Sequence, residues 1–202
     1  MIEEIPPLTQ ENIEARAAWA REHTATQWIP QQTLREDRAD GTIILRSPLP
    51  MDPVVTNTGQ WLHEWAQKAP DRVALSERVD PLAASGPWRD VTYRELLAHV
   101  RAVASGLLAQ GMAAGDKIAI LSGNSIDHLI LSLAAQYIGA PVTPLAEQYA
   151  LIEEAQGRLI FVLDKIKPKL AFVDDAGRYA SALKLPALDD VMVVASRTEG
   201  AP

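Results

Sequence analysis

Short apolar runs alternate with amphipathic helical segments along residues 53–195, and this alternation is the main pattern of the chain. Four of the runs are expected to be strands, and they lie at 118–121, 141–145, 170–173 and 191–194. The first is apolar at every position, like a strand that is buried on both faces. The segments between them carry apolar residues at helical spacing. Because strands that alternate with helices form right-handed βαβ units, the pattern predicts an α/β fold with a mostly parallel sheet and flanking helices.

A helix and a pair of strands are expected before these parallel units. The helix covers residues 58–68 and ends before Pro70, which cannot continue it. Two short strands at 73–75 and 88–92 are expected to pair across a loop rich in Pro, Ser and Gly. Packing in the core is the expected role of the tryptophans in this part, which are Trp61, Trp65 and Trp88.

The helices of the main body have recognisable ends. Thr92-Tyr93-Arg94-Glu95 has the form of a capping box, and the apolar helix that follows it is expected to end at Gly111. Further helices are expected from Asn124 or Ser125 to Gly139, over 152–166 and over 179–183. The adjacent carboxylates Asp174 and Asp175 are expected in a turn that exposes both of them to water.

The two ends of the chain differ from the main body. Residues 1–52 are predicted to be an amino-terminal extension, with an amphipathic helix starting near Thr9 and a short strand at 42–45. Residues 196–202 carry turn-type residues and no closing element, so we expect a truncated linker and an incomplete domain. Such a domain would expose apolar surface and tend to self-associate.

Charge and composition exclude several classes of function. The chain has 19 basic and 26 acidic side chains and a formal net charge of −7, without a basic run, so nucleic acid is not an expected partner. No apolar stretch approaches the length of a membrane span. The absence of cysteine excludes disulfides and thiolate metal sites, and the acidic amino terminus does not resemble a secretory signal. A cytoplasmic protein is expected.

Generic catalytic and cofactor motifs are absent from the sequence. There is no phosphate-binding loop ending in Gly-Lys-Ser/Thr, no Gly-x-Gly-x-x-Gly turn after a strand, no zinc-binding His-Glu-x-x-His and no nucleophile elbow. The histidines are too scattered to form a ligand cluster. We therefore assign no catalytic residue and no metal ligand.

One turn has the right position for ligand binding. Ser122, Asn124 and Ser125 follow a buried strand and open a helix, and His128 lies one turn into that helix. Open α/β sheets bind ligands at this edge, and the amide groups of a helix amino terminus favour anions. The alternative is that Asn124 and Ser125 only cap the helix and that His128 is a surface or capping residue.

Five pieces of sequence, in fixed order, carry a family resemblance. They are WLHEWAQKAPDRVAL at 61–75, WRDVTYREL at 88–96, GDKIAILSGNSIDH at 115–128, LAAQYIGAPVTPL at 133–145 and KPKLAFVDD at 167–175. From Trp61 onward the chain thus resembles the amino-terminal part of the adenylate-forming (AMP-binding) acyl-CoA synthetases. Within that family it is most similar to the feruloyl-CoA synthetases, through GTIILRSPLP at 41–50 and the ILSGNS turn.

The resemblance implies the first α/β subdomain of an acid–CoA ligase. Such enzymes join a carboxylate to ATP with Mg²⁺, release pyrophosphate, and transfer the acyl group from the adenylate to CoA. The family's phosphate loop, adenine motif, ribose-binding Asp and catalytic Lys have no counterpart in this chain, and residues 145–149 replace its usual Pro/Ser-rich turn. The implied substrate is an aromatic acid, and the implied partner is the rest of the same polypeptide. The 202-residue chain alone is expected to be inactive and to bind none of these cofactors.

In this reading Ser122, Asn124, Ser125 and His128 form one wall of the acyl or CoA channel. Two alternatives remain open. The chain could be a short binding or regulatory module derived from the same fold. It could also belong to another adenylate-forming enzyme, such as a fatty acyl ligase or a peptide-synthetase adenylation domain.

Overall fold

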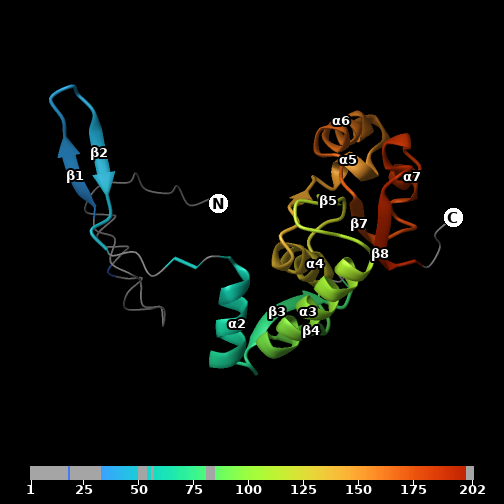
Figure 1. Cartoon of the computed structure of the whole chain (residues 1–202), viewed down its shortest axis with the longest axis horizontal. Coiled ribbons are helices and arrows are strands. Elements are labelled where there is room, and N and C mark those ends of the chain that lie inside the picture. Colours follow the sequence, from blue (N-terminus) through green and yellow to red (C-terminus); the bar gives the residue numbers. More distant parts are fainter. Residues whose placement is uncertain (1–17, 19–32, 50–53, 56, 81–84, 199–202) are drawn as a thin grey trace, which may run out of the picture. The chain divides into compact units, whose positions relative to one another are not determined.

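The structure is a computed structural model that describes residues 33–49, 54–55, 57–80 and 85–198, together with Ala18 (Figure 1). The chain divides into two units, Met1–Val54 and Val55–Pro202. Apart from Ala18, which is helical, the amphipathic helix predicted to start near Thr9 lies outside the described residues.

The described part of the first unit is an antiparallel hairpin of β1 (Leu34–Asp37) and β2 (Ile43–Arg46). The predicted strand at 42–45 corresponds to β2, displaced by one residue. Its partner β1 was not predicted, because its residues LRED are mainly charged and exposed and show no alternation of apolar and polar positions. The turn closes through the amide of Arg38, which donates to the carbonyl oxygen of Thr42, and through Gly41 at φ +83°.

A parallel sheet of four strands organises the second unit, as predicted. The strands are β5 (Ile118–Ile120), β6 (Val142–Pro144), β7 (Leu170–Asp175) and β8 (Met192–Arg197), in the spatial order β6-β5-β7-β8. All three strand pairings are parallel. β5 is completely buried, which explains its uninterrupted apolar sequence.

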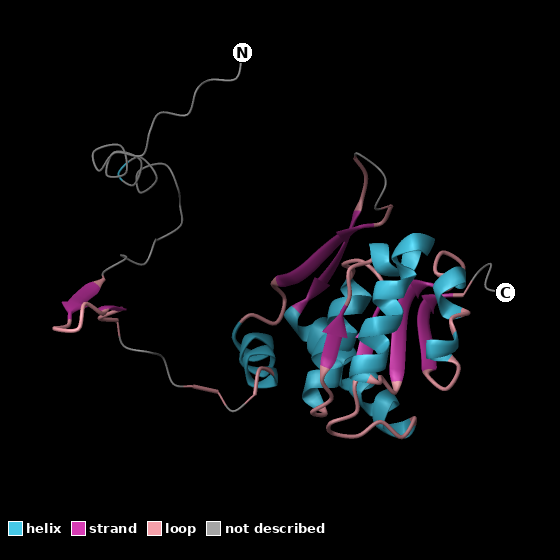
Figure 2. Ribbon diagram, turned by 90° about the horizontal axis from the view of Figure 1, so that it is seen from above, coloured by secondary structure: helices cyan, strands magenta, loops and turns pink. Residues whose placement is uncertain are grey.

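Helices cover both faces of this sheet (Figure 2). The first core joins α3 (Tyr93–Ala109) and α4 (Ile126–Tyr137) to one face of β5 and β7. The second core joins α6 (Gln156–Ile166) and α7 (Ala180–Leu183) to the other face. Consecutive strand residues point to opposite faces, so the short strands supply both cores.

Helix α2 (Gly59–Lys68) and an antiparallel hairpin precede the sheet. The hairpin consists of β3 (Val73–Arg78) and β4 (Trp88–Thr92), as the sequence predicted. The predicted capping box is also confirmed. The Thr92 side chain accepts from the amide of Glu95, and the Glu95 carboxylate accepts from the amide of Thr92 at 2.8 Å.

The three tryptophans of this part are exposed, so the prediction that they pack in the core is wrong. Trp61, Trp65 and Trp88 have 53%, 43% and 54% of their surface exposed. In α2 the buried residue is Leu62, whereas Trp65 stacks on Tyr93 at the surface. Apolar side chains at helical spacing thus identified the helix but not the width of its buried face.

The predicted helix over 152–166 is interrupted. The structure has α5 (Gln148–Leu151), a 3₁₀ turn η1 (Glu153–Ala155) and then α6. Ile152 takes an extended conformation, with ψ 116°, and separates the two α-helices. α6 ends at Lys167, which has the left-handed φ of 46° and precedes Pro168. A second 3₁₀ turn, η2 (Pro186–Leu188), leads into β8.

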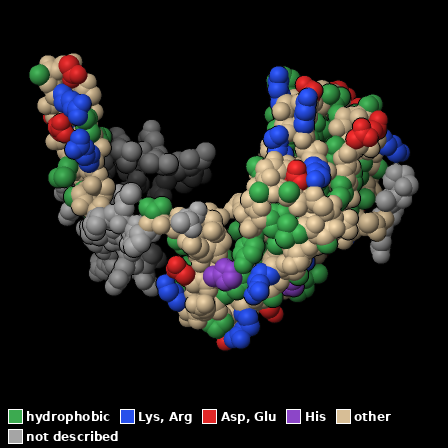
Figure 3. All heavy atoms as spheres, viewed as in Figure 1, with side chains coloured by type: hydrophobic (Ala, Val, Ile, Leu, Met, Phe, Trp, Pro, Cys, Tyr) green, Lys and Arg blue, Asp and Glu red, His purple; other side chains and the backbone are tan. Residues whose placement is uncertain are grey.

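Two surface properties complete the description. On the face shown in Figure 3, basic and acidic side chains are interspersed. Within the described residues, none of the helices is both long enough and apolar enough to cross a membrane.

Candidate functional site

The turn between β5 and α4 lies at the carboxyl end of the sheet, where the sequence placed its candidate residues. The amide of Leu121 still donates to Phe172 of β7, and the chain leaves the sheet at Ser122. Ser122 is only 2% exposed, and its Oγ has no hydrogen-bond partner among the described residues. A buried hydroxyl without a hydrogen-bond partner is uncommon and destabilising, so Ser122 is an unusual feature of this turn.

Ser125 and His128 are engaged inside the turn itself. The Ser125 hydroxyl accepts from the amide of His128 at 3.0 Å and caps α4. The His128 Nδ1–H donates to the carbonyl oxygen of Gly123 at 3.0 Å. The capping role proposed for Ser125 is therefore confirmed, and His128 fixes the path of the turn from within.

A cluster of charged side chains holds the amino terminus of α4 from the β3–β4 hairpin. Glu77 of β3 accepts from the amide of Ile126 through Oε2 at 2.7 Å. Arg89 of β4 contacts Oε1 of Glu77 at 3.2 Å and Oδ1 of Asp127 at 3.1 Å. Glu77 and Arg89 are directly opposite each other in the hairpin register. A carboxylate at this position is stabilised by the positive end of the helix dipole.

This cluster could not be found from the sequence. The contact between Glu77 and Ile126 spans 49 residues, and nothing in the local pattern near Glu77 indicates its partner. The single available signal was the alternation in the second half of β3, which places Glu77 on the same side of the hairpin as Leu75.

A polar cleft of about 290 Å³ opens beside this cluster, at the carboxyl ends of β7 and β8. Asn124 and Ser125 line it, whereas Ser122 and His128 are not among its lining residues. The structure thus brings two of the four predicted residues to one cleft and leaves the other two out of its lining. The cleft also includes Asp174 and several side chains that the sequence did not single out, namely Glu77, Arg78, Arg89, Asp127, Ser196 and Arg197.

The aspartates at the end of β7 face basic partners, which corrects the expected solvated turn. Asp175 belongs to β7 and lies opposite Arg197 in the register with β8. Arg197 contacts Asp174 Oδ2 at 3.4 Å and Asp175 Oδ2 at 3.6 Å. Asp174 Oδ1 is buried and has no hydrogen-bond partner among the described residues.

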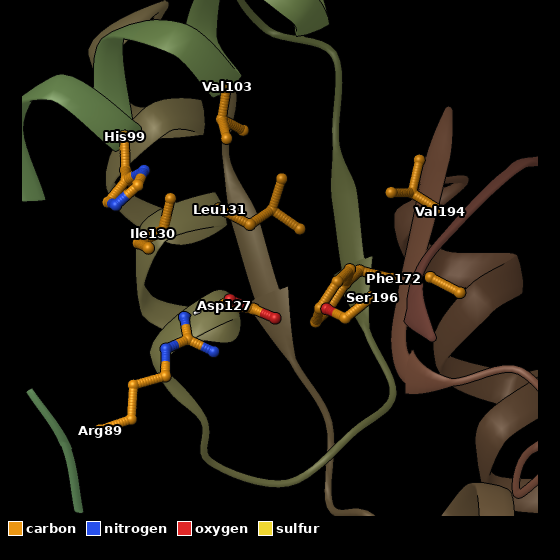
Figure 4. A pocket seen from close by; sticks show the side chains of 10 residues that line it. Arg89, His99, Val103, Asp127, Ile130, Leu131, Phe172, Val194 and Ser196 are labelled. Carbon is orange, nitrogen blue, oxygen red and sulfur yellow. Dashed lines mark hydrogen bonds and ion pairs between the residues drawn. The ribbon is translucent and has the colours of Figure 1, made fainter. Parts of the chain in front are cut away.

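An apolar cleft of about 300 Å³ adjoins the polar one and shares Arg89, Asp127 and Ser196 with it. We call it the β8 cleft. Figure 4 shows that its side chains come from two sides, from α3 and α4 on one and from β7 and β8 on the other. Its apolar walls consist of Val103, Ile130, Leu131, Phe172, Val194 and Ala195.

On the other face of the sheet, a polar cluster ties the turn after β6 to α7. Glu147 Oε1 accepts from the Tyr179 hydroxyl at 2.6 Å and contacts Arg178 at 2.8 Å. Burial, followed by the hydrogen bond to Glu147, raises the pKa of the Tyr179 phenol well above its usual range. Glu147 lies where the family's Pro/Ser-rich turn was expected, and here it has a structural role. Its carboxylate also lies close to Gly123, where a β-carbon would meet Glu147 Oε2 at 3.1 Å.

The described residues do not fit the phosphates of ATP or a magnesium ion. In the part of the chain that the structure describes, no group of three or more His, Asp or Glu side chains could hold a metal. Two of the three arginines that line the polar cleft are paired with carboxylates, Arg89 with Glu77 and Asp127 and Arg197 with Asp174. The third, Arg78, donates to the carbonyl oxygen of Gly86 at 3.1 Å and lies over the ring of Trp88. We therefore derive no catalytic step from this chain.

Comparison with known proteins identifies the family. Residues 62–200 match the family described as AMP-binding enzyme. The long-chain-fatty-acid–CoA ligase FadD15 of Mycobacterium bovis is 33% identical over 91 residues, which are 45% of this chain and 14% of that protein. The chain thus spans about a seventh of the length of this curated relative.

Two solved structures share the fold. A putative long-chain-fatty-acid CoA ligase from Rhodopseudomonas palustris is 28% identical with a TM-score of 0.56, over 69% of this chain and 32% of the other. The amino-terminal subdomain of Klebsiella oxytoca NpsA, in complex with anthranilyl-AMSN, is 26% identical with a TM-score of 0.53, over 69% of this chain and 31% of the other. The parallel sheet, its flanking helices and the match over residues 62–200 agree, and the chain belongs to the AMP-binding enzyme family.

Proposed function

We propose that this chain is the amino-terminal α/β part of an ATP-dependent acid–CoA ligase. It contributes scaffold and one wall of a channel and carries no catalytic group itself. The observation that supports this proposal most directly is the family match over residues 62–200, together with a span of only 14% of the length of a curated ligase. The rest of the same polypeptide would supply the phosphate loop, the catalytic Lys and the sites for ATP, Mg²⁺ and CoA.

An aromatic carboxylate is the proposed substrate, in a reaction like that of the feruloyl-CoA synthetases. Its support is the GTIILRSPLP run at 41–50, which includes the residues of β2, and the ILSGNS turn after β5. The NpsA subdomain, which shares the fold, is described in complex with an anthranilyl compound. The similarity to a long-chain-fatty-acid–CoA ligase supports a second candidate, a fatty acid substrate.

The channel wall is proposed for the carboxyl edge of β5. Asn124 and Ser125 would face the channel, because they line the polar cleft. His128 would fix the path of the turn through its bond to Gly123, and the buried Ser122 would not face the cleft. Open α/β sheets favour ligands at this edge.

Acid-dependent exchange of pyrophosphate into ATP tests the proposal. We expect the 202-residue chain to give no exchange with any acid. The longer polypeptide that contains it should give exchange with ferulate or anthranilate and much less with palmitate. Exchange with palmitate alone would mean that the substrate is a fatty acid and not the proposed aromatic acid. Exchange catalysed by the 202-residue chain itself would overturn the assignment of this chain as a scaffold.

A further inference from the structure

The β8 cleft combines an apolar interior with a polar end. Phe172 of β7 and Val194 of β8 are register partners, so their side chains lie on the same face of the sheet. Leu131 of α4 lies across from them (Figure 4). Phe172 and Leu131 are 3% and 5% exposed, whereas Val194 is 37% exposed, so the cleft opens along β8.

The volume of the cleft fits a small molecule. About 300 Å³ is at the lower end of the range for small-molecule sites, which are mostly apolar with a few polar groups that fix orientation. Here Arg89 from β4, Asp127 from α4 and Ser196 from β8 form the polar end. His99 of α3 lines the cleft as well (Figure 4). This arrangement of an apolar interior with one polar end matches an amphipathic ligand.

The charge at the polar end disfavours a free acid. Arg89 is the one guanidinium at this end, and it lies between two carboxylates, with Glu77 at 3.2 Å and Asp127 at 3.1 Å. A carboxylate that entered the cleft would therefore meet the carboxylate of Asp127 and a guanidinium whose charge is already balanced by Glu77 and Asp127. A hydroxyl or carboxamide, in contrast, donates a hydrogen bond to a carboxylate and accepts one from a guanidinium.

We propose that the β8 cleft binds a small neutral aromatic molecule that carries a hydroxyl or carboxamide group. The ring packs between Leu131, Phe172 and Val194, and the polar group bonds to Arg89 and Asp127. This site is separate from the turn of Ser122–Ser125, and the inference does not rest on the proposed ligase function. It also selects against the carboxylate form that an acid–CoA ligase uses as substrate.

The test is a titration of the isotope-labelled 202-residue chain with benzamide, in which NMR monitors the chemical shifts of the backbone amides. We expect shifts at Leu131, Phe172 and Val194. Benzoate should bind about fivefold more weakly, as expected for one unpaired charge repulsion near 4 Å in water. Asp127→Asn should reduce that difference, because it removes the carboxylate that lines the cleft.

Val194→Trp provides the decisive variant, because it fills the cleft from its open side. Its matched control is Val193→Trp on the same strand, since Val193 is 42% exposed and points to the other face. We expect Val194→Trp to weaken benzamide binding by about tenfold, the loss expected when a ring can no longer enter an apolar site. Val193→Trp should leave it unchanged, and thermal unfolding of both variants checks that they are folded.

Three outcomes would overturn the proposal. The first is the absence of benzamide shifts around the cleft. The second is benzoate binding as tight as benzamide binding. The third is a dimer of the wild-type chain that Val194→Trp dissociates and that benzamide does not affect, because a second copy would then be the occupant of the cleft.

Discussion

Removal of the Glu77 carboxylate should destabilise the second unit more than its partial exposure suggests. Glu77 accepts from the amide of Ile126 at 2.7 Å and pairs with Arg89 at 3.2 Å, and its side chain is 28% exposed. A hydrogen bond to a charged group contributes about 1.5–3 kcal/mol, and a largely exposed ion pair adds at most about 1 kcal/mol. We take the lower part of this range, because water can reach the amide once the side chain is gone.

For Glu77→Ala we therefore expect a loss of about 2 kcal/mol in the free energy of unfolding, which is a fall of about 1 M in the urea midpoint. Glu77→Gln should cost about half as much, because its amide oxygen still accepts from Ile126. Hydrogen exchange at the Ile126 amide should become faster in Glu77→Ala and remain slow in Glu77→Gln.

Glu64→Ala is the matched control for this measurement. Glu64 makes an exposed ion pair with Lys68 at 3.5 Å on the surface of α2, so its loss should cost less than about 0.5 kcal/mol. Equal costs for Glu77→Ala and Glu64→Ala, together with unchanged exchange at Ile126, would refute the view that the hairpin holds the amino terminus of α4.

Three further substitutions test other parts of the structure. Thr92→Ala should cost about 1 kcal/mol in urea unfolding, because it removes the cap of α3, and a cost near zero would contradict the capping box. The hydrogen bonds from Thr92 lower the pKa of Glu95 below its ordinary 4.5. The stability that this carboxylate contributes is therefore present above pH 4.5 and is lost as the pH falls through the lower pKa of the folded state. This loss of stability in acid should be seen in the wild type and should be smaller in Glu95→Gln. Burial raises the pKa of Tyr179 above its ordinary 10.0, so the stability that its protonated hydroxyl contributes is present below that pH and declines above it. Tyr179→Phe should cost about 1 kcal/mol in the free energy of unfolding at neutral pH and should remove this alkaline decline. An unchanged alkaline profile would contradict the buried contact with Glu147.

The parallel sheet could be predicted because its central strands, β5 and β7, are buried on both faces. The run Ile118–Leu121 is apolar at every position, and the structure buries all four side chains completely. The capping box at Thr92 is equally local, since both of its hydrogen bonds join residues three positions apart. Features that depend on a few neighbouring residues are therefore readable from the sequence.

Features that depend on distant contacts or on the width of a buried face were not readable. The spacing of Trp61 and Trp65 predicted their burial, but α2 buries Leu62 and leaves both rings exposed. The strand β1 has no apolar alternation, because its residues are exposed on both faces of a two-stranded hairpin. Tertiary contacts decide such positions, and local propensity carries little information about them.

The candidate site shows the same division. The turn of Ser122–Ser125 was found from the sequence, because it follows a buried strand and precedes a helix cap. Glu77 and Arg89, which hold the helix beside that turn, come from a separate hairpin. Their role depends on how the hairpin packs against α4, and a single sequence does not contain that information.

The size of the natural polypeptide tests the central claim most directly. An antibody raised against this chain, applied to an immunoblot of source-cell extract, measures it. A role as the amino-terminal part of an acid–CoA ligase predicts a band much larger than the 22.0 kDa of this chain. A single band at 22.0 kDa would contradict that role and would favour a short binding or regulatory protein with the same fold.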